Sequence, residues 1–74
     1  MSEEVTELDR KILEVIIRDS HRPSAITNIL QKRGIDCTQN QVVQSLNGLE
    51  EKGLVERYTS KTWVATSDAE DYVE

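Results

Sequence analysis

The sequence predicts a small α+β domain, mainly α-helical, in which three helices are followed by a two-stranded β-hairpin. The first observation is that apolar residues recur at helical spacing in three successive stretches. The second is that each stretch begins at a capping residue or a proline, and that a glycine follows two of them. The third is a pair of short runs of β-branched and aromatic residues toward the C-terminal end.

The first helix is expected over residues 6–19, after a flexible N-terminus formed by residues 1–5. Thr6 is suited to cap this helix, because its hydroxyl can accept a hydrogen bond from a first-turn N–H. One face is expected to be buried, because apolar residues repeat at helical spacing: Leu8, Ile12, Leu13, Ile16 and Ile17. The residues between Asp19 and Arg22 are expected to form a loop.

The second helix is expected over residues 23–33, with Pro23 at its first position, where the N–H has no helical partner in any case. Gly34 ends it, because a glycine adopts the left-handed conformation without steric cost. The third helix is expected over residues 38–52, where Thr38 and Gln41 have the spacing of a capping box. A short helix, a glycine turn and a capped helix form the helix-turn-helix pattern.

Gly53 is expected to stop the third helix, and strands are expected over residues 54–58 and 62–66. Together with the helix-turn-helix, such a hairpin makes a winged helix-turn-helix. Trp63 is expected to be partly buried against the first and third helices, because a core this small needs an aromatic anchor. The acidic tail, residues 67–74, is expected to be disordered, with a single helical turn as the alternative.

The stretch QVVQSLNGLEEKGLVER at residues 41–57 resembles small bacterial and archaeal regulators of the multiple-antibiotic-resistance type. The residues that match their pattern are Leu46, Leu49, Glu50, Lys52, Gly53, Leu54 and Val55. The resemblance extends over residues 8–66 and implies a DNA-binding transcriptional regulator with a winged-helix fold. Two departures are that Thr27 stands where alanine is usual, and that Gln44 stands near the usual position of a base.

Composition excludes several classes of function. With one cysteine and one histidine, the chain has no metal-ligand set and no base–nucleophile pair, so we expect neither an enzyme nor a cofactor. No apolar run is long enough to cross a bilayer, and no secretory signal is evident, so no membrane contact and a cytoplasmic location are expected. The net charge is −5, yet residues 20–66 hold six bases and four acids. The segment that would bind DNA is therefore mildly basic.

Double-stranded DNA is the expected partner, with the third helix in the major groove and residues 59–61 of the wing on the backbone. The amides and the serine of the third helix are expected to read bases, since glutamine and asparagine pair with adenine: Gln39, Asn40, Gln41, Gln44 and Ser45. Contacts to phosphates are expected from Arg22, Ser24, Thr27, Arg57 and Lys61.

Two interpretations compete with this assignment. The amide side chains form an ordinary solvated helix surface in the first, with Gln41 serving only its cap. In the second, the domain is a protein–protein interaction module of a replication or transcription assembly, and it docks on a basic partner through the acidic first helix or the tail. In either case the chain is expected to be a monomer or a weak homodimer.

Overall fold

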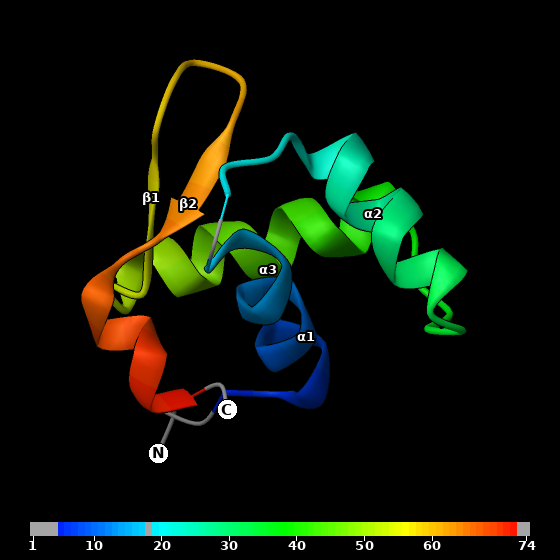
Figure 1. The fold of residues 1–74 in the computed structure, drawn as a ribbon, viewed down its shortest axis with the longest axis horizontal. Helices are drawn as coiled ribbons and strands as arrows, with labels where there is room; N and C mark the ends of the chain where they lie inside the picture. The colour runs from blue at the N-terminus through cyan, green and yellow to red at the C-terminus, as the bar shows by residue number, and fades with distance from the viewer. Residues whose placement is uncertain (1–4, 18, 73–74) are drawn as a thin grey trace.

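A computed structural model describes residues 5–17 and 19–72 and contains three α-helices followed by a hairpin and a 3₁₀ helix. The elements are α1 (Glu7–Ile16), α2 (Pro23–Lys32), α3 (Gln39–Glu51), β1 (Val55–Arg57), β2 (Trp63–Ala65) and η1 (Ser67–Tyr72). In Figure 1, α3 lies across the middle of the molecule, with the hairpin near one of its ends and α2 near the other. The predicted fold class, three helices with a C-terminal β-hairpin wing, is confirmed.

Capping boxes begin two of the helices. At α1 the Thr6 hydroxyl accepts from the Asp9 N–H at 3.1 Å, and the Asp9 carboxylate accepts from the Thr6 N–H. At α3 the Gln41 side chain and Thr38 exchange the same pair of hydrogen bonds. Since α1 ends at Ile16, with Ile17 as its C-cap, it is shorter than the range predicted. The expectation of a flexible N-terminus falls mostly on residues 1–4, which lie outside the described residues.

The two predicted glycine stops have the left-handed backbone that the sequence led us to expect. Gly34 has φ +84° and Gly53 has φ +78°. After each of them, the next N–H donates back across the helix end: Ile35 to the Leu30 carbonyl and Leu54 to the Leu49 carbonyl, both at 3.0 Å. These bonds turn the chain sharply from α2 toward α3 and from α3 into the hairpin.

The hairpin pairs Val55 with Ala65 and Arg57 with Trp63 in antiparallel register. A third segment joins it, because His21 exchanges two backbone hydrogen bonds with Trp63, at 2.9 and 3.0 Å. The sequence predicted only a loop at this position. In Figure 1 the cyan segment before α2 reaches across to β2, so the start of α2 is tied to the wing.

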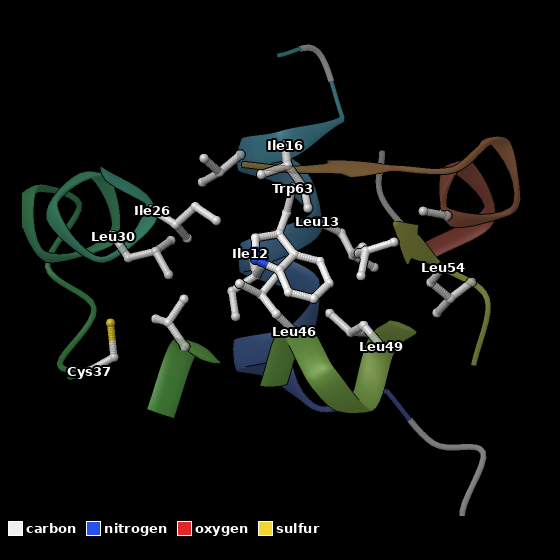
Figure 2. Packing of buried hydrophobic residues seen from close by; sticks show 14 residues of the cluster. Ile12, Leu13, Ile16, Ile26, Leu30, Cys37, Leu46, Leu49, Leu54 and Trp63 are labelled. Atoms are coloured by element: carbon white, nitrogen blue, oxygen red, sulfur yellow. The ribbon is translucent and has the colours of Figure 1, made fainter. Parts of the chain in front are cut away.

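The core is formed where the three helices and the hairpin meet. Figure 2 shows the Trp63 ring among Ile12 and Leu13 of α1 and Leu46 of α3. Trp63 is only 6% exposed, so it is more deeply buried than the sequence led us to expect. Each fully buried leucine or isoleucine side chain around it stabilises the fold by about 1.5–3 kcal/mol. The core therefore fixes the position of the wing relative to α3.

The expectation of a disordered tail is wrong for residues 67–72, which form η1. Ala69 is fully buried, and η1 packs against α1. The Thr66 hydroxyl donates to the Gly53 carbonyl at 2.8 Å, and the Ala69 N–H donates to the Thr66 carbonyl at 3.0 Å, so the chain is held as it leaves β2. Residues 73–74 lie outside the described residues.

Candidate nucleic-acid interface

A hollow lies between the start of α2, the side of α3 and the wing, by which we mean β1, β2 and the turn between them. We call it the wing-side hollow. It is lined by Arg22, Pro23, Ser24, Gln39, Val43, Asn47, Arg57, Ser60, Lys61 and Trp63. Five of the ten predicted DNA-binding residues meet here, namely Arg22, Ser24, Gln39, Arg57 and Lys61. Three of the lining residues are cations, and none of the described residues that line the hollow is acidic.

The wing tip is closed by one threonine. The Thr59 hydroxyl accepts from the backbone N–H groups of Lys61 and Thr62, both at 3.2 Å, and lies 2.8 Å from the Thr62 hydroxyl. The Tyr58 N–H donates to the Thr62 carbonyl at 2.9 Å. This local network satisfies the turn without glycine. It fixes the backbone that carries Lys61 beside the hollow.

Arg57 is held over the aromatic anchor of the core. It pairs with Trp63 across the hairpin, and its guanidinium carbon lies 5.0 Å from the centre of the tryptophan ring. Such a cation–π contact is worth about 0.5–1 kcal/mol at an exposed site. It holds the guanidinium beside the wing-side hollow, which Arg57 lines.

The start of α2 completes the third side of the hollow. Arg22 occupies the N-cap position, where no side chain accepts from the first-turn N–H groups, and Pro23 and Ser24 follow it. A helix start of this kind attracts an anion through its unpaired N–H groups and its dipole. Since His21 is bonded to Trp63, Arg22 lies directly beside the wing. Arg22 and Ser24 were predicted as contacts from the sequence, but the backbone connection between His21 and Trp63 was not.

The side of α3 that lines the hollow is a stripe of residues four apart: Gln39, Val43 and Asn47. Gln39 and Asn47 are exposed, while Val43 is half-buried. Only Gln39 was predicted as a contact. Asn47 was missed, because eight residues place it about 80° round the helix from Gln39, and only the position of the wing brings both residues to one hollow. Asn40 is exposed on the same helix but does not line the hollow.

The other predicted readers lie on the opposite flank of α3. Gln41, Gln44 and Ser45 line a second, α1-side hollow together with Asp9 and other residues at the start of α1. The Gln41 side-chain oxygen accepts from the Thr38 N–H at 3.0 Å, as the capping interpretation predicts. The residues predicted as one reading face are therefore separated: Gln39 lines the wing-side hollow, Gln41, Gln44 and Ser45 line the α1-side hollow, and Asn40 lines neither. Of these two hollows, only the wing-side one contains cations.

Thr27 does not reach the surface. It is 6% exposed, and its hydroxyl donates to the Pro23 carbonyl at 2.8 Å, one turn earlier in α2. The prediction that it contacts a phosphate is therefore wrong.

Comparison with known proteins adds no relative: no family model matches the chain, and no curated protein shows significant similarity to it. The helices in the described part of the chain are all too short or too polar to span a membrane.

Proposed function

We propose that this protein binds double-stranded DNA as a transcriptional regulator in the cytoplasm. The first two turns of α3 enter the major groove, and the wing lies on the sugar–phosphate backbone. A helix with its side chains is about 10–12 Å across, which matches the roughly 12 Å width of the major groove. The proposal is supported by one observation above all. Three cations from separate parts of the chain meet at the wing-side hollow, where no described lining residue is acidic.

The distribution of charge supports the same orientation. The chain as a whole carries a net charge of −5, but the hollow that would contact the duplex is lined by three cations. Acids in the last turn of α3, Glu50 and Glu51, restrict close contact to the beginning of the helix. In helix-turn-helix proteins it is this N-terminal part of the recognition helix that contacts base edges.

The small number of cations limits the expected affinity. If Arg22, Arg57 and Lys61 each neutralise one phosphate, the logarithm of the binding constant falls with the logarithm of salt concentration with a slope of about −2.7. A monomer with this slope binds a duplex weakly at physiological salt. Pairing of two copies on DNA or tethering to another DNA-binding protein would raise the affinity through effective concentration.

Lys61→Ala tests the contact between the wing and the backbone. Lys61 lies on the fixed wing tip, so we expect this variant to weaken binding to all duplexes alike and to reduce the salt slope by about one. Lys32→Ala is the matched control, because Lys32 is an exposed lysine in the last turn of α2 and does not line the hollow. Fluorescence anisotropy at several salt concentrations gives both slopes. Equal losses in the two variants would contradict a specific role for the wing.

A second candidate function is a protein-interaction module that docks on a basic partner in a replication or transcription assembly. It is favoured by the net charge of −5 and by the acids of η1 and of the first turn of α1. These two elements lie at the end of the molecule opposite the wing tip (Figure 1). If the protein binds no duplex even at low salt, this second function replaces the first.

A further inference from the structure

Before Glu50, the exposed side of α3 presents amides and one valine but no charged side chain. Gln39, Asn40, Gln44 and Asn47 are exposed, and Val43 is half-buried between Gln39 and Asn47 in the wing-side hollow. The first charged residue of the helix is Glu50. A partner of this part of α3 would therefore contact hydrogen-bonding amides and an apolar side chain.

Each type of side chain suits a particular base in the major groove. Arginine and lysine suit the two acceptors of guanine, and acidic residues suit the amino group of cytosine. Asparagine and glutamine suit the acceptor and donor of adenine, while apolar side chains contact the thymine methyl group. Before Glu50, the exposed part of α3 holds the residue types for adenine and thymine and lacks those for guanine and cytosine.

The stripe also determines how many base pairs are read. From Gln39 to Asn47 the helix rises by about 12 Å, at about 1.5 Å per residue. Since base pairs are spaced by about 3.4 Å, the stripe spans about four of them. Val43 lies halfway along the stripe, with an amide on each side. The cations of the hollow belong to the wing and to the start of α2, where they serve the backbone instead of the bases.

We infer that the wing-side hollow selects duplexes with an A·T-rich core of about four base pairs, where Val43 packs against a thymine methyl group. This inference rests on the proposed DNA binding and adds the class of sequence recognised. Val43 and Asn47 are the new specificity residues; Val43 contacts the methyl group and Asn47 pairs with adenine.

The test uses the unmodified protein and labelled duplexes of equal length that differ only in a central core of A·T or G·C pairs. Fluorescence anisotropy at low salt is expected to give at least about tenfold tighter binding to the A·T core, because each lost amide–adenine pair costs fivefold or more. Replacing the core thymines by uracil removes only the methyl groups. We expect this change to weaken binding about fourfold for each contacted thymine.

Variants assign the effect to residues. Val43→Ala is expected to bind thymine and uracil cores equally, since the side chain that meets the methyl group is shortened. Asn47→Ala is expected to reduce the preference for the A·T core about fivefold or more. Asn28→Ala is the matched control, because Asn28 is an exposed asparagine of α2 that does not line the hollow, and it is expected to keep both the core preference and the uracil effect. Circular dichroism checks that each variant is folded.

The outcomes separate the inference from the proposed function. Equal binding to both cores, or a preference for G·C, overturns the inference while DNA binding stands. A preference for A·T that uracil leaves unchanged in the wild-type protein also overturns it, because the thymine methyl groups would then contribute nothing to binding. Failure to bind either duplex at low salt removes the proposed function itself.

Discussion

Two threonines of the same chemistry have opposite environments in this domain. Thr27 lies inside the helix-turn-helix, where its hydroxyl is satisfied by the Pro23 carbonyl. Thr59 lies at the exposed wing tip, where its hydroxyl accepts from two backbone N–H groups. The first threonine contributes to stability, and the second arranges a surface that we propose to meet DNA.

Thr27→Ala tests whether Thr27 contributes to stability without contributing to DNA binding. It removes a buried methyl group and a hydrogen bond, so the free energy of unfolding is expected to fall by about 1–2 kcal/mol. Duplex affinity is expected to stay unchanged, because Thr27 does not reach the surface. Thermal denaturation measures the first quantity and anisotropy measures the second. A loss of affinity in the folded variant, with no loss of stability, would contradict the buried position.

At this scale the sequence predicts types of residue better than their partners. The capping threonines and the two glycine stops follow from local spacing, because their causes lie within a few residues. The position of Thr27 and the contact between Arg57 and Trp63 depend on which face of an element meets another element. Spacing within one segment does not contain that information.

The glycines on either side of the end of α3, Gly48 and Gly53, have different backbone conformations. Gly48 lies inside the helix, and a Cβ built there would meet nothing within 4 Å. Gly53 ends the turn after the helix at φ +78°, a conformation that an L side chain rarely adopts. The first glycine is therefore replaceable, whereas the second is required by the backbone.

Gly48→Ala is expected to raise the free energy of unfolding by about 0.5–1 kcal/mol, because alanine has the higher helix propensity. Gly53→Ala is expected to lower it by about 1–2 kcal/mol, because of the left-handed backbone. The two variants add the same methyl group, so each serves as a control for the other. Urea denaturation that changed both in the same direction would contradict this account of the helix end.

Docking of η1 on α1 gives a second prediction for an element. Ala69 is fully buried, so Ala69→Asp is expected to cost about 2 kcal/mol or more by placing a charge in an apolar site. Glu70→Ala changes an exposed neighbour on the same element and is expected to alter stability by less than about 0.5 kcal/mol. Equal melting temperatures for the two variants would mean that η1 is not packed.

The sequence missed η1 because the composition of this segment is that of a solvated tail. A single alanine among acids gives no periodic signal, and its burial depends on a space left open beside α1. The bridge between His21 and Trp63 was missed for a related reason. It is made by backbone groups only, so no side-chain pattern marks it.

At the scale of the whole molecule, the wing tip lies at one end, and η1 and the start of α1 lie at the other (Figure 1). The candidate DNA-binding cations gather near the wing, whereas η1 and the first turn of α1 carry acids. An approaching duplex would be attracted by one end and repelled by the other. This polarity reconciles a negative net charge with a DNA-binding role, since an electrostatic interaction acts over about 10 Å at moderate salt.

The interface could be predicted from the sequence only in part for the same geometric reason. The pattern of the wing predicts Arg57 and Lys61 as phosphate contacts, and the start of α2 predicts Arg22 and Ser24. The division of α3 into a wing-side flank and an α1-side flank depends on how the helix is rotated in the core. Its rotation is set by the buried side chains of Val42, Leu46 and Leu49 and by the elements they meet.

A two-dimensional NMR titration of labelled protein with duplex DNA at low salt tests whether the wing-side hollow binds DNA. We expect chemical-shift changes to concentrate on residues 21–24, 39–47 and 57–63 and to disappear as salt is raised. Residues 67–72, at the far end of the molecule, are expected to be unaffected. Changes that concentrate on η1 and α1, or no changes at millimolar DNA, would contradict the assignment of the wing-side hollow to DNA.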